Sequence, residues 1–168
     1  MDERVRMTER LVLLPHEAKR DLEGLFPILS DPAVMEHIGN GAITHEEARD
    51  YLVLNETHWE VRGLGGWTIR RRAIADVIGY IFLRPTPEAS AVEVGYTLGK
   101  HAWGNGYATE ALSEVLRFAC ERRFETVVAV VRPANNRSAK VLLRCGFQFD
   151  GQRENDGKAR QYYSLSLG

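Results

Sequence analysis

The sequence predicts an α/β fold in which one mixed β-sheet carries helices on both faces. Two observations predict the fold, and a third predicts the number of domains. Short β-rich runs alternate with segments in which apolar residues recur at helical spacing. Between residues 91 and 131, a strand, a long helix and a second strand follow one another, which is the order of a right-handed parallel crossover. The length of 168 residues suits one domain, so residues 1–168 are expected to fold as a single unit.

The first elements are expected between residues 8 and 32. Residues 8–14 (TERLVLL) predict a first strand, which Pro15 ends. Apolar residues then recur at helical spacing over Glu17–Leu29, which indicates a helix. The pair Asp31-Pro32 can open another short helix, with the aspartate as N-cap and the proline at the first helical position.

A capped helix and a hairpin follow. Thr44 has Glu47 three residues after it, which is the pattern of a capping box, so a helix is expected from there to about Glu60. Residues 66–71 (GWTIRR) and 77–83 (VIGYIFL) are β-rich and separated by a short turn. These two runs predict a β-hairpin.

The crossover occupies the second half of the chain. Residues 91–98 (AVEVGYTL) predict a strand, and 106–123 predict the clearest helix, with one apolar stripe along it. Residues 126–131 (TVVAVV) are apolar throughout, which is typical of a strand covered on both faces. The remaining elements are a helix over 135–145, ended by Gly146, and two closing strands at 147–149 and 162–167.

Two glycines, Gly104 and Gly106, lie between the strand and the long helix. A helix start has free backbone N–H groups and a partial positive charge, so this turn can bind an anion, most naturally phosphate. A tight turn without a ligand gives the same pattern. The sequence has no Walker loop, and Thr109 stands where a Rossmann fingerprint needs its third glycine.

The residues around this turn carry a resemblance. Residues 93–98 (EVGYTL) followed by 103–111 (WGNGYATEA) resemble the acetyl-CoA motif of the GNAT acetyltransferase superfamily. More narrowly, the chain is similar to the branch of the RimJ/RimL-type ribosomal-protein N-terminal acetyltransferases. The further matches are residues 8–11 (TERL), 67–69 (WTI) with 79–81 (GYI), and 135–138 (NNRS) with 146–147 (GF).

The resemblance implies an acyl-CoA N-acyltransferase fold of about seven strands with a splayed central parallel pair. It implies an N-acetyltransferase, in which an amine attacks acetyl-CoA directly. Backbone groups of one splayed strand would pair with pantetheine, and an N–H near Gly95 or Tyr96 would meet the thioester carbonyl. The turn would hold the pyrophosphate. The cofactor-binding residues implied are Val94, Gly95, Tyr96, Thr97, Leu98, Trp103, Gly104, Asn105, Gly106, Tyr107, Ala108, Thr109, Asn135 and Ser138.

Catalytic roles follow from the same resemblance. Glu93 matches an acidic position and is the candidate general base, although a surface strand also explains it. Ser138 is the candidate acid for the leaving thiolate, because the family's tyrosine position holds Leu142 here; an N-cap turn also explains this serine. Tyr162 and Tyr163 are alternative acids, of which at most one can face the cleft.

Other positions are expected to have no part in the chemistry. His101 stands where the family has Gln or Arg, so no side-chain phosphate contact is expected from it. Cys120 and Cys145 are expected to be small buried groups, and no acyl-cysteine route is expected. The histidines lack metal-ligand spacing, so no metal is expected.

The composition restricts the partners. With 22 basic and 23 acidic residues, the net charge of −1 disfavours general nucleic-acid binding, and no apolar run is long enough for a membrane span. Unpaired cysteines indicate a reducing, cytoplasmic setting. The expected partner is an amine, either a peptide N-terminus or a small molecule, and similar enzymes favour a homodimer. The alternative function is a CoA-binding module without catalysis.

The acceptor itself is not predicted. The three arginines of residues 70–72 could attract an acidic acceptor, or they could form a solvated face. Trp59, Trp67 and Tyr80 could line the acceptor cleft, or they could belong to the core.

Overall fold

The computed structural model describes all 168 residues and is built around one eight-stranded sheet, ordered β1-β2-β3-β4-β5-β6-β8-β7. Only β5 and β6 pair in parallel; all other neighbours are antiparallel. The strands are β1 (Arg6–Met7), β2 (Leu11–Pro15), β3 (Gly66–Arg71), β4 (Val77–Pro85), β5 (Ala91–Leu98), β6 (Thr126–Val131), β7 (Gln148–Asn155) and β8 (Lys158–Ser166). The predicted mixed sheet is confirmed.

The sheet has one strand more than the roughly seven expected. Residues 8–10 are not part of a strand; they form the turn that connects β1 to β2, and Arg6 pairs opposite Leu13. The short strand β1 extends the sheet edge because the chain folds back on the apolar run.

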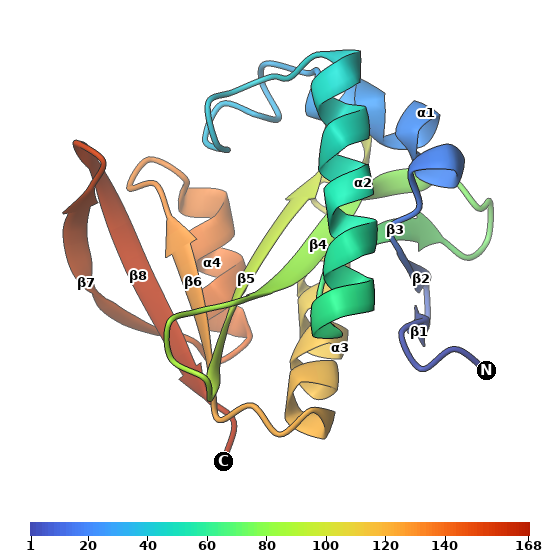
Figure 1. The fold of residues 1–168 in the computed structure, drawn as a ribbon. Coiled ribbons are helices and arrows are strands. Elements are labelled where there is room, and N and C mark those ends of the chain that lie inside the picture. The colour runs from blue at the N-terminus through green and yellow to red at the C-terminus, as the bar shows by residue number, and fades with distance from the viewer.

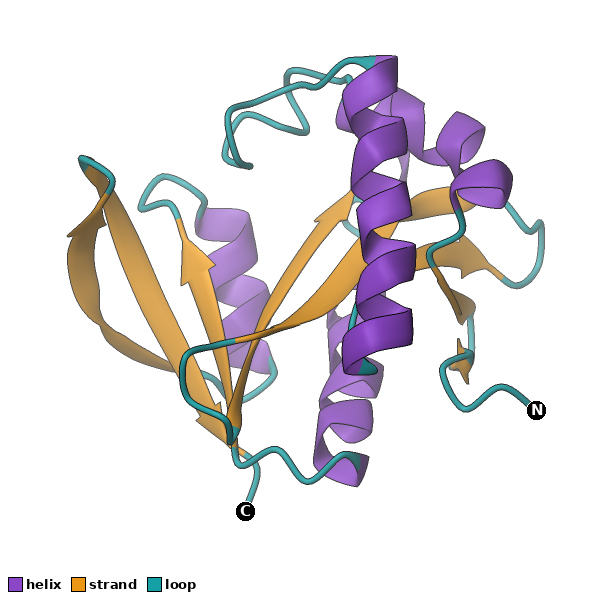
Figure 2. Ribbon diagram, viewed as in Figure 1, coloured by secondary structure: helices purple, strands orange, loops and turns teal.

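Helices lie on both faces of the sheet (Figure 1, Figure 2). On one face are α1 (Ala18–Leu29) and α2 (His45–Arg62), and on the other are α3 (Tyr107–Glu121) and α4 (Asn136–Arg144), with a short 3-10 turn at Lys100–Ala102. The predicted capping box is present: Thr44 Oγ1 accepts from Glu47 N at 3.2 Å, and Glu47 Oε2 accepts from Thr44 N at 2.7 Å. None of the helices is both long and apolar enough to cross a bilayer.

The helix expected at Asp31-Pro32 does not form. Residues 30–43 are a loop of turns between α1 and α2. The Asp31 carboxylate does accept from Ala33 N at 2.9 Å, as an N-cap would, and Met35 N donates to the Asp31 carbonyl at 3.0 Å, but the chain continues in turns after this single turn. The loop is attached to the end of β6 instead, because the Arg132 guanidinium donates to the Glu36 carbonyl at 3.0 Å and to the Gly39 carbonyl. It lies above the parallel strands (Figure 1).

The strand β6 is covered on one face only, which corrects the prediction from its sequence. Val127, Ala129 and Val131 are buried in the main core with α3 and α4. Val128 and Val130 face the other side and are partly exposed. The helices α1 and α2 lie over β3 to β5, so the same face of β6 and β8 has no helix in front of it (Figure 1).

The parallel strands β5 and β6 splay apart, as predicted. They pair only at Ala91, Val92 and Glu93, opposite Thr126, Val127 and Val128. Beyond these pairs, residues 94–98 of β5 bond only to β4 on their other side. One edge of β5 is therefore free along the gap between the strands.

A buried carboxylate joins α1 to the sheet. The Asp21 side chain has no exposed surface, and it accepts from Arg20 at 2.6 Å, Arg70 at 3.1 Å and Glu17 N at 3.0 Å. Burial alone would raise the pKa of Asp21, but the hydrogen bond from Arg20 and that from the Glu17 backbone lower it below its usual value. Asp21 therefore stays ionised and fixes Arg70 of β3.

The two cysteines are free, and the prediction that both are buried is wrong for Cys120, which is exposed. It follows the buried Phe118 and Ala119 on α3 but falls outside their apolar stripe. Cys145 is half-buried, and burial raises the pKa of its thiol.

Candidate active site

Three adjoining cavities follow the gap between β5 and β6. We call them the turn cavity, of about 340 Å³ beside Gly104 and Gly106; the middle cavity, of about 420 Å³ between Trp103, α4 and the loop 30–43; and the sheet cavity, of about 460 Å³ on the face that α1 and α2 partly cover. The turn and middle cavities share Trp103 and Arg137. The middle and sheet cavities share Tyr96, Asn135 and Ser138.

The glycine turn has a backbone that other residues rarely adopt. Gly104 and Gly106 have φ angles of 77° and 78°, in the left-handed region that favours glycine. Gly106 is the N-cap of α3 and supplies no side-chain cap, so the first N–H groups of the helix stay free for a ligand. Trp103 Nε1 donates to the Leu98 carbonyl at 2.8 Å, and Arg10 donates to the Asn105 carbonyl at 2.9 Å. These bonds hold the turn in place.

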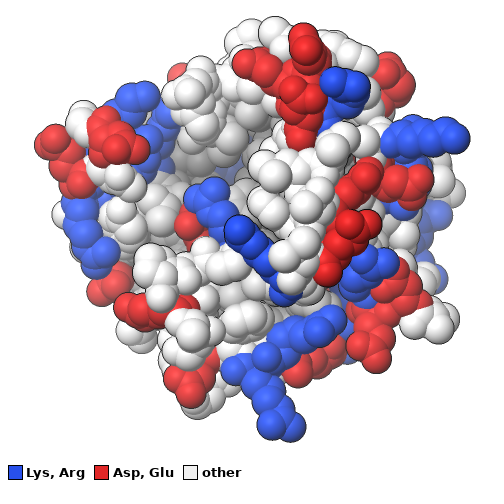
Figure 3. Space-filling model, viewed as in Figure 1, with Lys and Arg blue, Asp and Glu red and all other residues white.

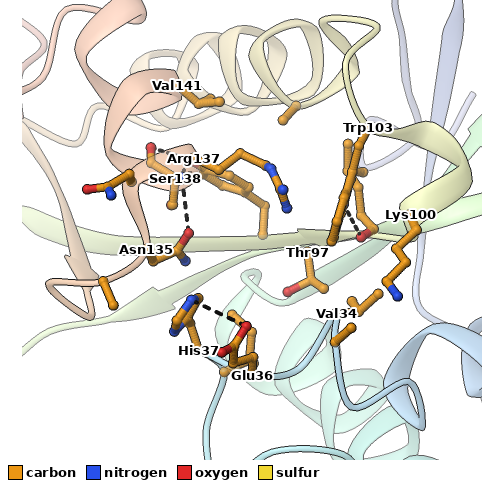
Figure 4. A pocket seen from close by; sticks show the side chains of 17 residues that line it. Val34, Glu36, His37, Thr97, Lys100, Trp103, Asn135, Arg137, Ser138 and Val141 are labelled. Carbon is orange, nitrogen blue, oxygen red and sulfur yellow. Dashed lines mark hydrogen bonds and ion pairs between the residues drawn. The ribbon is translucent and has the colours of Figure 1, made fainter.

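Positive charge gathers opposite the turn, on α4. Arg137, Lys140 and Arg144 line the turn cavity, and the middle cavity adds Lys100. The Arg137 guanidinium lies 3.5 Å from the centroid of the Trp103 ring, and Figure 4 shows the two side by side. Sequence reasoning missed these three α4 residues, although their spacing of three and seven residues places them on one helix face. Free N–H groups and cations together suit a phosphate ligand.

The free edge of β5 supplies a second binding element. Residues 94–98 line the middle and sheet cavities, and their backbone polar groups on the β6 side have no partner strand. Such groups need hydrogen bonds from a ligand or from water. An extended ligand with amide groups, as pantetheine is, fits this edge as an added strand.

Ser138 and Tyr96 form a hydrogen-bonded pair where the middle and sheet cavities meet. Ser138 Oγ donates to Tyr96 Oη at 3.0 Å, and Tyr96 Oη donates to the Ser138 carbonyl at 3.1 Å. Burial raises the pKa of Tyr96, and the hydrogen bond with Ser138 offsets this only in part, so the phenol stays neutral. Asn135 Oδ1 accepts from Ser138 N at 3.2 Å, which makes Asn135 the N-cap of α4 (Figure 4).

Glu93 lies on the sheet-cavity side, at the point where the two strands part. Its carboxylate accepts from Arg84 at 2.7 and 3.1 Å, and Arg84 stands directly opposite it on β4. The Glu93 side chain is 20% exposed, so the carboxylate is open to the cavity while the arginine fixes its position.

The other predicted site residues fall into two groups. Every residue expected to bind the cofactor lines one of the three cavities except Asn105, whose amide donates to the Ala102 and Trp103 carbonyls at 3.3 and 2.9 Å. Tyr162 and Tyr163 line none of the three. Tyr163 is buried on the face away from Glu93, and its ring centroid lies 5.6 Å from that of Phe149.

The arginines of residues 70–72 are all engaged away from the cavities. Arg70 pairs with Asp21, Arg71 with Asp76, and Arg72 donates to the Thr8 and Glu9 carbonyls. Trp59 and Trp67 are core residues, and their ring centroids lie 4.7 Å apart. His101 faces Asp76 at 3.8 Å and lines none of the three cavities.

Known proteins share this arrangement. The family model described as "Acetyltransferase (GNAT) domain" matches residues 10–148. The chain belongs to the GNAT acetyltransferase family. The N-acetyltransferase p20 of Bacillus licheniformis is 30% identical over 157 residues, which cover 91% of this chain and 87% of p20.

Solved structures agree with the family assignment. An acetyltransferase from Agrobacterium tumefaciens is 25% identical, has a TM-score of 0.83, and covers 98% of this chain and 95% of its own. RimL, a ribosomal-protein acetyltransferase solved with coenzyme A, is 18% identical, with a TM-score of 0.83 over 97% of this chain and 98% of its own, and shares the fold. This GNAT protein is therefore an acetyl-CoA-dependent acetyltransferase. No three His, Cys, Asp or Glu side chains are grouped so as to hold a metal ion.

Proposed function

We propose that this GNAT enzyme acetylates a primary amine by direct attack on acetyl-CoA, and that it belongs to the RimJ/RimL-type branch. One observation carries the proposal: the middle cavity, which continues from the turn cavity, meets the sheet cavity that holds Glu93 at Tyr96, Asn135 and Ser138. The donor enters from the side of the glycine turn and the amine from the side of Glu93. The acetyl group is passed where the two cavities join.

The donor is held by three elements. The N–H groups of the glycine turn, together with Arg137, Lys140 and Arg144, bind its phosphates. The free edge of β5 pairs with the pantetheine amides. A backbone N–H near Gly95 or Tyr96 stabilises the thioester oxygen as negative charge develops on it. Acetyl-CoA supplies the activated acetyl group.

Glu93 and Ser138 manage the protons. An α-amine has a pKa of about 8 and loses its proton more readily than a lysine amine, whose pKa is about 10. Glu93 takes this proton, directly or through water. The neutral nitrogen then bonds to the acetyl carbonyl carbon and gives up a second proton as the carbon–sulfur bond breaks. Ser138 Oγ turns its single proton from Tyr96 Oη to the departing sulfur, which leaves as a thiol, and the serine regains a proton from the nitrogen. Tyr96 holds Ser138 in place by donating to its carbonyl.

Thiol release from acetyl-CoA, measured against a panel of N-terminal peptides and small amines, tests the activity. Glu93→Gln and Ser138→Ala are each expected to lower kcat about 100-fold or more at saturating acetyl-CoA. Glu154→Gln and Ser166→Ala are matched controls on the exposed surface of β7 and β8, and should leave kcat unchanged. Near-normal kcat in both active-site variants would show that the assigned chemistry is wrong.

Three further expectations remain predictions: a single domain over residues 1–168, a homodimer and a cytoplasmic location. Size-exclusion chromatography with light scattering tests the homodimer.

A further inference from the structure

The sheet cavity carries more positive than negative charge. Its lining includes three arginines, Arg84, Arg132 and Arg160, against one carboxylate, Glu93. The formal balance is +2, in a chain whose net charge is −1. A local excess of this sign attracts an anionic ligand.

The three arginines differ in their partners. Arg84 is paired with Glu93. Arg132 donates to two backbone carbonyls of the loop 30–43, so its bonds are used for holding that loop. Arg160 is half-buried, and its one hydrogen bond goes to the neighbouring Ala159 carbonyl at 3.0 Å. No carboxylate pairs with it, so its charge and most of its N–H donors are available to a ligand.

Strand register places Arg160 on the same side of the sheet as Glu93. Glu93 is opposite Val128 in the β5–β6 ladder, and Val130 is opposite Tyr162 in the β6–β8 ladder. Side chains alternate along a strand, so residues two apart share a face: Val128 with Val130, and Tyr162 with Arg160. Because paired residues also share a face, Arg160 lies on the same face of the sheet as Glu93. The two side chains reach the cavity from opposite sides of the gap. Figure 3 shows a hollow on this side of the molecule with basic side chains at its left and lower edges.

We propose that Arg160 binds a carboxylate on the amine acceptor. This inference rests on the proposed function and adds the class of acceptor: a small primary amine that also carries a carboxylate, such as an amino acid or a short peptide. The planar fork of a guanidinium matches a carboxylate with two parallel hydrogen bonds. Glu93 receives the amine end while Arg160 holds the acid end. The cavity of about 460 Å³ suits a small molecule.

The test compares acceptors that differ only in this charge. Dipeptides and ω-amino acids are each paired with their carboxamides, whose amine lies far enough from the altered group for its pKa to change little. The wild-type enzyme is expected to show kcat/KM at least about tenfold higher for the carboxylate member of each pair. Arg160→Gln should bring this ratio close to one, and Arg160→Lys should retain part of it. The KM for acetyl-CoA should not change.

Arg153→Gln is the matched control. Arg153 stands opposite Arg160 on β7, is exposed, and lines none of the three cavities, so the same loss of charge should leave the ratio intact. If the wild-type enzyme turns over amines with no preference for the carboxylate member, this inference alone is overturned. The same holds if Arg160→Gln lowers kcat/KM equally for both members of a pair. Absence of thiol release with every amine overturns the proposed function, and this inference with it.

Discussion

A Tyr96→Phe variant removes one oxygen atom from the place where the middle and sheet cavities meet. The phenol makes two hydrogen bonds to Ser138, at 3.0 and 3.1 Å. A neutral hydrogen bond contributes about 0.5–1.5 kcal/mol, and the bond from the phenol to the Ser138 carbonyl is the one that remains when the serine hydroxyl turns to the sulfur. If this energy orients Ser138 in the transition state, kcat should fall roughly 2- to 13-fold. The KM for acetyl-CoA should stay near its wild-type value.

A double-mutant cycle separates this role from simple loss of stability. If Tyr96 acts only through Ser138, the double variant Tyr96→Phe/Ser138→Ala should be no slower than Ser138→Ala alone. Tyr163→Phe is the matched control, because Tyr163 is also buried but lines none of the three cavities. The reasoning is refuted if the two single effects on kcat add, or if Tyr96→Phe lowers kcat no more than Tyr163→Phe does.

Three further outcomes test other parts of the structure. Asp21→Ala should lower the free energy of unfolding by about 3–5 kcal/mol, measured by urea titration, because two partly buried arginines lose their partner. The folded-state pKa of this carboxyl is lowered, so its contribution is present above the unfolded pKa of about 3.9 and is lost as the pH falls below it. Lys140→Gln and Arg144→Gln should each raise the KM for acetyl-CoA about three- to tenfold. If one of these residues binds the 3′-phosphate, its substitution should have a smaller effect on the KM for a donor that lacks this phosphate. Arg132→Gln should raise the KM of both substrates, because the loop that it holds lines both the middle and sheet cavities.

Each of these outcomes has a result that contradicts it. An Asp21→Ala penalty that is as large at pH 3 as at pH 7 would show that the carboxylate charge is not the source of the stability. Lys158→Gln, an exposed change on β8, controls for loss of positive charge in general. If it raises the KM for acetyl-CoA as much as Lys140→Gln does, the phosphate assignment fails. A rise in only one KM in Arg132→Gln would mean that the loop does not close over both sites.

Local patterns determined much of the fold. The capping box at Thr44, the hairpin of β3 and β4 and the stripe of α3 depend on residues within a few positions of one another, so the sequence alone predicts them. The same holds for the turn at Gly104 and Gly106, whose positive φ angles the chain can adopt because the residues are glycines. The family resemblance rests on these local motifs as well, and the matched family model agrees with it.

Tertiary structure decided what the cavities contain. Arg160 faces Glu93 only because β8 pairs beside β6 and reverses its direction there, which no local pattern encodes. Tyr96 meets Ser138 across 42 positions in the chain, and Arg132 holds a loop more than 90 positions earlier. The open face of β6 likewise depends on where α1 and α2 lie. The sequence therefore determined the contiguous strand, turn and helix of the donor side, while packing between distant segments placed the α4 cations beside that turn and decided the acceptor side.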